Sequence, residues 1–538
     1  MSVFAETIFE NKYAHVVNDR KETWDECAKR VAQTVMRPLL PHLADRCEEL
    51  IRDKKFIPGG RYLYATGRAF PQVNNCFLFR AKDSRQGWGN LMDKATNSLM
   101  TGGGIGVVYT DVRYEGAHVG GLGGASTGPI ALMNMVNESG RYIRQGGSRR
   151  SAIWAGLHWY HKDALKFIRA KQWPEYLADA KWRDFNAAAP LDMTNISIIL
   201  DDDFFVAIKD RNHESHQWAK DVYREAVTLM LETGEPGFSV DCGEHRYENL
   251  RNACTEVTSE DDSDICNLGS LNLAAFRGLD DINKFASAVD IATAFLICGT
   301  LYSVLPIPDM NVTRNKNRRL GLGLMGVHEF LIRNGDHYGM SATLRAYLYR
   351  YCLSGMYANR YADKLRVSRP VATRAIAPTG TISIIAGTTS GIEPIFAVAY
   401  KRRYLDGATW KAQYVVDPTA KRLIDAGIKP SAIESAYDLA QDPERRVAFQ
   451  AELQSFVDQG ISSTINLPAC EFNDGYRQSF SEMLLRYLPR LRGITAYPDG
   501  ARGGQPLVPV PYEEAIEQVG VEFEDGSEEQ CRSGICGI

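Results

Sequence analysis

Short apolar runs alternate with longer helical segments along most of the chain, and this pattern limits the possible folds more than any other feature. The strand-like runs lie at 107–109, 152–157, 195–200 and 375–386, and the helical segments at 129–144, 214–233, 281–304, 319–333 and 341–364. Such alternation is typical of α/β sheets and barrels and disfavours an all-helical fold. A chain of 538 residues can also bury about three quarters of its unfolded surface, so it needs no disulfides to fold.

Charge and hydropathy argue against nucleic acid and membranes as partners. Lysine and arginine together number 62, against 66 for aspartate and glutamate, and the net charge of −4 argues against a nucleic-acid-binding protein. The N-terminal stretch is polar and lacks the apolar core of a signal peptide. Because no window approaches 18 uncharged apolar residues, we expect no membrane span and a reducing, cytoplasmic location.

The eleven cysteines are too sparse and too irregular for a secreted disulfide scaffold. Two of them, Cys531 and Cys536, lie within the last eight residues, in a segment with almost no apolar side chains to bury them. A zinc site would need two more ligands at short spacing, and no other Cys or His is near. We interpret the pair as a dithiol on a mobile tail that exchanges disulfides, with incidental cysteines and a metal site as the alternatives.

A second cysteine lies in the pattern Asn252-x-Cys254-x-Glu256, and ten residues later the run Ile265 to Leu273 contains Cys266. If the segment is extended, residues 252, 254 and 256 point to one side, because side chains alternate along a strand. An amide, a thiol and a carboxylate on one face suit radical or acid/base chemistry on a polar substrate. The alternative is a loop whose cysteine packs inward.

Several further blocks, taken together with this pattern, resemble the ribonucleotide reductases of the oxygen-tolerant classes. The blocks are Cys76, Gly103–Gly106, Gln145–Arg150, Arg318–Gly323, Ala377–Ser383, Gly391–Pro394 and the C-terminal cysteine pair. Each block is weak alone, but their joint presence in this order extends over most of the chain. The resemblance implies a ten-stranded α/β barrel, made of two five-stranded parallel halves around a central finger loop. It divides the chain into an N-terminal helical region (1–70), the barrel (71–510) and a redox tail (511–538).

The resemblance also assigns roles to the cysteines and their neighbours. Cys254 carries a thiyl radical that abstracts the ribose 3′-hydrogen, Glu256 is the base at the 3′-hydroxyl, and Asn252 holds the ribose hydroxyls. Cys76 and Cys266 form the dithiol that reduces the sugar and ends as a disulfide. Cys531 and Cys536 re-reduce that disulfide, and thioredoxin or glutaredoxin re-reduces the tail.

Two nucleotide sites are implied besides the ribose-binding residues. The substrate phosphate fits the run Thr379, Gly380, Thr381, Ile382 and Ser383, which offers hydroxyl donors and a glycine that lets the backbone approach; a Thr-rich strand is the alternative. A specificity site for a deoxynucleoside triphosphate or ATP, at the interface of an expected homodimer, is placed at Asp83, Arg113, Arg149 and Arg150. As single residues, these arginines are equally compatible with solvated surface.

The family divides by how the radical is generated, and the sequence favours one class. No Tyr-Tyr dipeptide of the class with a separate metal-carrying subunit occurs, and the glycyl-radical context is absent. The segment Gly493 to Arg502 resembles the adenosylcobalamin-dependent class, which needs no such subunit. A class I-like catalytic subunit and an inactive nucleotide-binding paralogue remain alternatives, and no Cys or His pattern indicates a metal site.

Only 75 residues precede Cys76, and none match the ATP-cone domain of the family. We therefore expect an enzyme without on/off control by dATP. The sequence leaves open whether the substrate is a diphosphate or a triphosphate.

Overall fold

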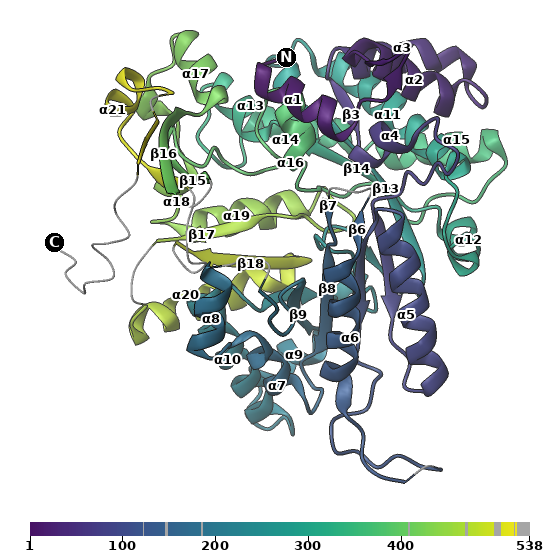
Figure 1. Cartoon of the computed structure of the whole chain (residues 1–538), viewed down its shortest axis with the longest axis vertical. Helices are drawn as coiled ribbons and strands as arrows, with labels where there is room; N and C mark the ends of the chain where they lie inside the picture. Colours follow the sequence, from purple (N-terminus) through teal and green to yellow (C-terminus); the bar gives the residue numbers. More distant parts are fainter. Residues whose placement is uncertain are drawn as a thin grey trace.

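A large mixed β-sheet forms the centre of the computed structural model, and helices cover its outside (Figure 1). The structure describes residues 1–121, 123–145, 149–183, 187–406, 409–468, 472–499, 507–520 and 522–524. Within these residues the sheet has ten strands, in the order β14-β13-β4-β5-β8-β9-β10-β18-β17 with β3 paired to β13.

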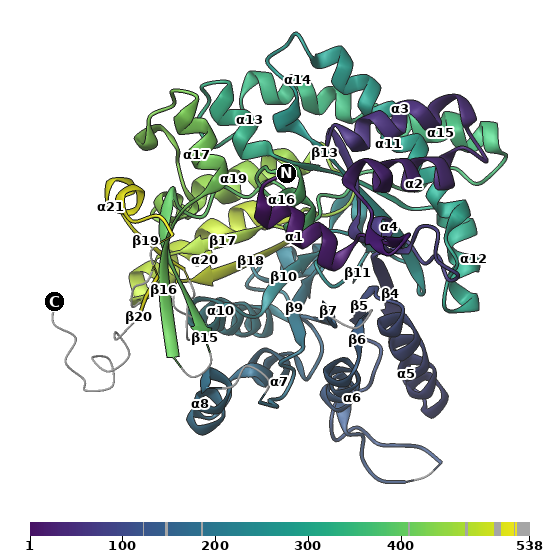
Figure 2. The same ribbon diagram turned by 45° about the horizontal axis from the view of Figure 1, so that its top comes forward.

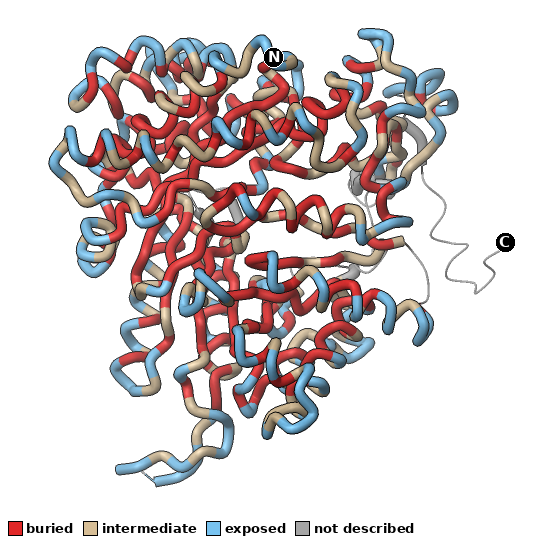
Figure 3. Tube along the Cα trace, turned by 180° about the vertical axis from the view of Figure 1, so that it is seen from behind, coloured by how far each residue is buried: buried red, intermediate tan, exposed pale blue. Residues whose placement is uncertain are grey.

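Five parallel strands make the first half of the sheet: β4 (Cys76–Arg80), β5 (Gly104–Val108), β8 (Ile153–His158), β9 (Thr194–Leu200) and β10 (Gly237–Val240). They are connected through α5 (Arg85–Met100), α6 (Gly128–Tyr142), α7 (Ala164–Ile168), α8 (Glu175–Arg183), α9 (Asp202–Ala207) and α10 (His216–Thr233). Nearly every residue of these strands is buried, as Figure 3 shows for the centre of the molecule. Continuous apolar runs such as Ile153 to Leu157 are what a sheet covered on both faces requires.

The second half continues the sheet, and isolated bridges link the region between its two end strands. Strands β13 (Asp264–Asn272) and β14 (Leu320–Met325) are parallel, as are β17 (Thr464–Leu467) and β18 (Gly493–Pro498). Residues 372–376 lie between these pairs, through the parallel bridges Leu322↔Arg374 and Ile376↔Ile461. The halves meet antiparallel, β13 against β4 and β18 against β10. This arrangement agrees with the barrel of two five-stranded halves that the sequence predicted.

Two of the expected elements are wrong in type. The predicted helix 319–333 begins as strand β14, because Gly321 and Gly323 alternate with apolar residues and let the strand pack closely against its neighbours. Only residues 327–333 are helical, as α13 (Val327–Arg333). The predicted strand 375–386 continues from its first residues into α16 (Gly380–Ala386), after Thr379 adopts a left-handed backbone with φ of 54°.

The N-terminal region is helical, as expected, and packs over one end of the barrel. It contains α1 (Val3–Lys12), α2 (Trp24–Met36), α3 (Pro41–Arg52), α4 (Gly60–Ala65), the hairpin β1 (Val16–Val17) and β2 (Arg20–Lys21), and β3 (Phe56–Pro58). A capping box fixes the start of α2: Thr23 and Glu26 each satisfy the other's backbone amide. Helix α1 contacts α16, so the start of the chain reaches the centre of the molecule.

Helix α11 (Ile282–Tyr302) is long and apolar enough to cross a membrane by length and composition, which the sequence analysis did not anticipate. However, 72% of its most apolar window is buried inside the protein, where α11 contacts α2, α3, α14 and α15. Its composition is therefore explained by its place in the core. The other helices are α12 (Pro308–Asn317), α14 (Ala342–Tyr351), α15 (Ser354–Leu365), α17 (Pro418–Asp425), α18 (Ala436–Leu439), α19 (Pro443–Gln454) and α20 (Asp474–Tyr487).

The C-terminal elements attach to a hairpin at the edge of the molecule, formed by β15 (Ala399–Asp406) and β16 (Thr409–Val416) (Figure 2). Strand β19 (Leu507–Pro509) pairs with β15, and β20 (Glu522–Glu524) pairs with β16. Helix α21 (Tyr512–Glu517) packs against both hairpin strands. The first part of the expected redox tail is therefore folded onto this hairpin. Cys531 and Cys536 lie outside the described residues.

Candidate active site

A short hairpin, β11 (Leu250–Arg251) and β12 (Thr258–Ser259), carries the loop 252–257 into the barrel. The backbone of the barrel wall lies in direct contact with the backbone of this finger. A methyl group at Gly106 of β5 would lie 1.8 Å from the carbonyl oxygen of Arg251, and one at Gly460 would lie 2.6 Å from that of Thr255. Glycine is needed at both positions because the two backbones approach so closely.

Arg251 fixes the base of the finger. Its buried guanidinium donates hydrogen bonds to the carbonyl oxygens of Val240 at 2.8 Å and Arg492 at 3.2 Å, and also to that of Glu248. The finger is thereby attached to β10 and to the segment just before β18. Because a single buried side chain holds both segments, the position of the loop is set by the barrel.

The loop is a turn, not the extended segment that the sequence predicted. The amide of Thr255 donates to the carbonyl of Asn252 at 3.1 Å, and Thr255 has a φ of 67°, an uncommon value for a β-branched residue. The predicted outcome nevertheless holds, because Asn252, Cys254 and Glu256 all line one cavity of about 580 Å³.

Three side chains form a polar chain inside this cavity. The Asn252 Nδ2 donates to the Cys76 Sγ at 3.0 Å, and the Cys76 thiol points to the Glu256 Oε1 at 3.9 Å. The Asn252 Oδ1 accepts from the Val257 amide at 3.0 Å, which orients its Nδ2 toward the sulfur. The second carboxylate oxygen of Glu256 is buried and has no hydrogen-bond partner among the described residues, so it can accept a proton from a bound molecule.

Cys76 and Cys266 lie directly opposite each other across the antiparallel strands β4 and β13. Opposite residues in such a pair have Cα atoms about 4.5–5.5 Å apart, within the range of about 4.4–6.8 Å that a disulfide spans. Both side chains are buried, and burial raises the pKa of each thiol well above its usual value. The pair can therefore form a disulfide without backbone movement, and in the reduced state both sulfurs carry protons.

The predicted phosphate-binding run lies at the opposite wall of the cavity, where Thr379, Gly380, Thr381 and Ile382 line it. Gly380 leaves the backbone open, since a methyl group there would meet nothing within 4 Å. The Thr379 hydroxyl accepts from the Gly391 amide at 2.8 Å. Ser383 is the exception, because its hydroxyl bonds to Ser390 at 2.8 Å and is not among the residues that line the cavity.

The N-terminal region contributes cavity residues that the sequence analysis missed. Tyr13 shares a hydrogen bond with Thr381, and Arg61 lies over the ring of Tyr64 at 5.1 Å. The missed side chains of this region are those of Lys12, Tyr13, Arg61 and Tyr64. No local motif could have identified them, because tertiary packing alone brings them to the finger.

Two of the predicted effector residues, Asp83 and Arg113, are not among the residues that line the cavity. The Arg113 Nε pairs with the Asp83 Oδ2 at 2.6 Å, so these two residues are brought together as expected. Arg149 and Arg150 form β7, which pairs with β6 (Arg144–Gln145), and the connecting residues 146–148 lie outside the described part of the chain.

A second, smaller cavity of about 170 Å³ lies on the other side of the finger. Cys254, Ala253 and Pro378 line both cavities. The small cavity adds two aromatic side chains, Trp154 and Tyr497, and a set of polar ones: Asn195, Ser197, Glu235, Ser462, Ser463, Thr464 and Thr495. Gly493, Ile494, Thr495 and Tyr497 of the segment 493–502 take part in it. The Cys254 thiol therefore stands between two compartments of different composition.

Two parallel halves of a mixed sheet surround a finger that carries Cys254, and the facing pair Cys76 and Cys266 lies in the wall beside it, an arrangement that suits a thiol-dependent reductase. The family model for the ribonucleotide reductase barrel domain matches residues 74–251, 211–348 and 369–486. The chain therefore belongs to the ribonucleotide reductase family.

Three curated relatives are similar to this chain over most of its length. A vitamin B12-dependent ribonucleoside-diphosphate reductase of Mycobacterium tuberculosis is 27% identical over 90% of this chain and 76% of its own length. A protein of the same description from Thermoplasma acidophilum is 24% identical over 87% and 66%. A putative adenosylcobalamin-dependent ribonucleoside-triphosphate reductase of Mycobacterium phage D29 is 28% identical over 77% and 64%.

Proposed function

We propose that the chain reduces ribonucleotides to 2′-deoxyribonucleotides for DNA synthesis, with Cys254 as the radical carrier. The convergence of Cys254, Cys76, Asn252 and Glu256 on one cavity, with Cys266 directly opposite Cys76 on the neighbouring strand, carries this proposal. Removing a 2′-hydroxyl as water and replacing it by hydrogen consumes two electrons and two protons, and a dithiol that becomes a disulfide supplies all of them.

Each residue has a role that its surroundings support. Cys254, at the tip of the finger, takes the 3′-hydrogen of the ribose and returns it at the end of the reaction. Glu256 accepts the 3′-hydroxyl proton at its unpartnered oxygen, and Asn252 orients the Cys76 thiol. The protonated Cys76 can give its proton to the departing 2′-hydroxyl, and the second thiol hydrogen of the pair ends on C2′ as the two sulfurs join.

The residues of the small cavity fit a 5′-deoxyadenosyl group. Trp154 and Tyr497 offer flat apolar surfaces for a base, and the hydroxyl and amide side chains around them suit ribose hydroxyls. When bound, adenosylcobalamin supplies the oxidising equivalent that turns a thiol into a thiyl radical. We propose that Cys254 receives it, because this thiol lines the small cavity and the substrate cavity together.

The remaining partners follow from the same chemistry. The substrate phosphates would bind at Gly380 and Thr381, with Lys12 at the cavity wall. A homodimer with a nucleotide effector near Asp83, Arg113, Arg149 and Arg150 is proposed on the resemblance. Because its disulfides are intermediates of turnover, the enzyme would work in the reducing cytoplasm.

The direct test is to incubate the purified chain with a ribonucleotide, dithiothreitol and adenosylcobalamin. We expect deoxyribonucleotide to form only when all components are present. Parallel reactions with the diphosphate and the triphosphate establish the substrate. Absence of product that a diiron or dimanganese subunit restores would contradict the cofactor assignment.

Activity should rise with pH through the ionisation of Glu256. Burial raises the pKa of this carboxyl to about 7, and a general base must be ionised to accept a proton. We therefore expect kcat/KM to fall about tenfold per pH unit below the pKa and to level off above it. Rates from about pH 5.5 to 8.5 would show this limb. Glu256→Gln should lower the rate and remove the limb, whereas a limb that persists in this variant would belong to another group.

Turnover should depend on the tail cysteines only when the reductant is a protein. We expect Cys531→Ser to keep turnover with dithiothreitol, which enters the cavity directly, and to lose it with thioredoxin. Deoxynucleotide formation with each reductant measures the difference. Cys242→Ser, which alters a cysteine outside both cavities, is the control and should behave as the native enzyme with both. Equal activity of Cys531→Ser with thioredoxin would remove the tail from the pathway.

A further inference from the structure

We propose that the Cys76–Cys266 disulfide is reduced in one direction: the incoming thiolate attacks Cys76, and Cys266 leaves as a thiolate stabilised by Arg319. This proposal rests on the function proposed above and assigns a positioning role to Arg319, which lines neither cavity. It follows from two differences between the sulfurs, their access and their charged neighbours.

Access favours attack on Cys76. Cys76 lines the substrate cavity, whereas Cys266 does not, although the two residues lie opposite each other on the sheet. The wall behind Cys266 is closed, because a methyl group at Gly321 of the adjacent strand would lie 3.0 Å from its Sγ. A small thiol, or a thiol on a segment of chain, that enters the cavity therefore meets the sulfur of Cys76.

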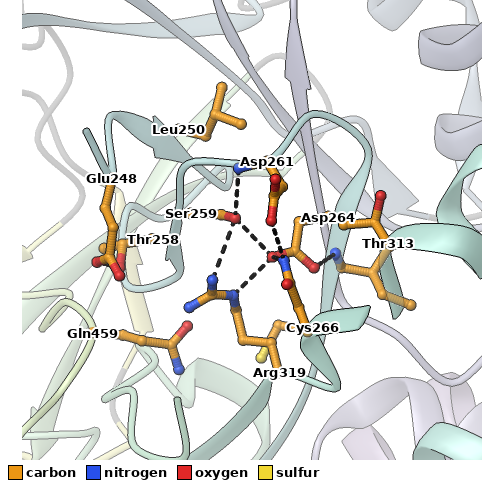
Figure 4. A network of polar contacts seen from close by, with 12 residues as sticks. Glu248, Leu250, Thr258, Ser259, Asp261, Asp264, Cys266, Thr313, Arg319 and Gln459 are labelled. Atoms are coloured by element: carbon orange, nitrogen blue, oxygen red, sulfur yellow. Dashed lines mark hydrogen bonds and ion pairs between the residues drawn. The ribbon is translucent and has the colours of Figure 1, made fainter. Parts of the chain in front are cut away.

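Charge favours release of Cys266. In the parallel strands β13 and β14, Asn267 pairs with Leu320. Cys266 and Arg319, each one residue earlier in its strand, therefore lie side by side (Figure 4). The buried guanidinium lowers the pKa of the Cys266 thiol against the effect of burial. Cys76 has no such neighbour: the Glu256 carboxylate, beside it, raises the pKa of the Cys76 thiol further.

The other charges that face Cys266 are three carboxylates, which raise the pKa of its thiol against the effect of Arg319. Asp264 accepts from the Arg319 Nε at 2.9 Å, from Ser259 at 2.7 Å and from Asn317 at 2.9 Å. Asp458 accepts from two backbone amides and pairs with Arg374 at 3.3 Å. Glu256 is the third, and it lies against Cys76.

One nitrogen of the Arg319 guanidinium forms no hydrogen bond among the described residues. Its Nη2 donates to Ser259 at 3.3 Å, but its Nη1 is buried and has no hydrogen-bond partner among the described residues. An unsatisfied buried donor is costly, and an anion that forms near the guanidinium offsets part of that cost. Figure 4 shows the Cys266 sulfur beside Arg319, whose guanidinium is directed toward Ser259 and Asp264.

The exchange balances as follows. The thiolate of a dithiol reductant forms a bond to the Cys76 Sγ, the Cys76–Cys266 bond breaks, and the electron pair of that bond stays on Cys266. Cys266 then takes a proton released by the second thiol of the reductant. That second thiolate attacks its partner sulfur, which frees Cys76, so that the reductant ends as a disulfide. A leaving thiol of lower pKa departs faster, so the arginine sets the direction.

The direction can be read from a trapped mixed disulfide. Full-length protein carrying Cys531→Ser and Cys536→Ser is oxidised with diamide, reacted briefly with glutathione, quenched with acid and mapped by peptide mass spectrometry. We expect at least about 90% of the adduct on Cys76, with Cys266 recovered as a thiol. The same oxidised protein in urea should give adducts on both residues. Adducts mainly on Cys266, or divided evenly in the folded protein, would overturn the direction.

Arg319 is tested with a matched pair of variants. Arg319→Met, combined with Asp264→Asn so that no buried carboxylate is left unpaired, should slow reduction of the disulfide by glutathione roughly tenfold. Arg319→Lys with Asp264 intact should restore most of the rate. In the Cys76→Ser background, the pH profile of Cys266 alkylation should shift upward in the methionine variant. A merely structural role would leave that profile unchanged and would overturn the assignment.

Different results would contradict the proposed function and the proposed direction of disulfide reduction. If mild oxidation gives no Cys76–Cys266 disulfide, the reducing pair itself is wrong and both proposals fall. If the disulfide forms and glutathione is found on Cys266, only the direction is wrong. Neither result depends on adenosylcobalamin or on turnover.

Discussion

Cys254→Ala is expected to abolish ribonucleotide reduction, to less than about one ten-thousandth of the native rate, which corresponds to about 5.4 kcal/mol in the activation free energy. The reason is positional. Among the described residues, Cys254 is the cysteine that lines both the small cavity and the substrate cavity, whereas Cys76 lines only the larger one. No neighbouring thiol can therefore carry a radical from one compartment to the other.

The measurement is deoxynucleotide formation in the presence of adenosylcobalamin and dithiothreitol. Cys254→Ser keeps the shape of the side chain and should be equally inactive, because its O–H bond is too strong to replace the thiol. Nucleotide binding and thermal unfolding should stay native in both variants, since the side chain is only half-buried. Cys352→Ala, which changes a half-buried cysteine outside both cavities, is the matched control and should remain active. More than about 1% residual activity in Cys254→Ala would show that another group carries the radical.

The chemical groups of the site were predictable from the sequence, but their conformation was not. The spacing of Asn252, Cys254 and Glu256 indicated a shared face, and all three line one cavity. The segment was expected to be extended, but it forms a turn, because Thr255 adopts a positive φ that no residue preference predicts. The face is shared because the whole loop is inserted into the barrel.

Other failures have the same origin in tertiary contacts. Leu320 to Met325 and the helix after it form one apolar run, and only packing against β13 makes the first part a strand. Tyr13 and Arg61 reach the cavity from the N-terminal region, far from every motif in sequence. Arg319 stood within a recognised block, but its closeness to Cys266 depends on the pairing of β13 with β14.

Gly106→Ala is expected to be the most damaging single-methyl change in the barrel wall. The new methyl group would lie 1.8 Å from the Arg251 carbonyl oxygen and 2.7 Å from its carbonyl carbon. Both are backbone atoms, and the guanidinium of the same residue holds them in place, so the finger must move as a unit. Overpacking of this kind costs about 3 kcal/mol or more, which exceeds the gain of about 0.4–1 kcal/mol from a stiffer unfolded chain.

Activity should fall further than stability, because a shift of the finger by about 1 Å can cost about a hundredfold in rate. Thermal unfolding and deoxynucleotide formation measure the two effects. Gly104→Ala is the matched control on the same strand face, since its methyl group would meet the Ala253 Cβ at 3.0 Å and no backbone atom closer than 3.5 Å. An alanine Cβ moves only with its backbone, but here the finger has to give by only a few tenths of an ångström, so we expect activity within about tenfold of native. If Gly106→Ala behaves like Gly104→Ala, then the barrel wall does not hold the finger, and the rigid placement of Cys254 between its two compartments must come from Arg251 and Gly460 alone.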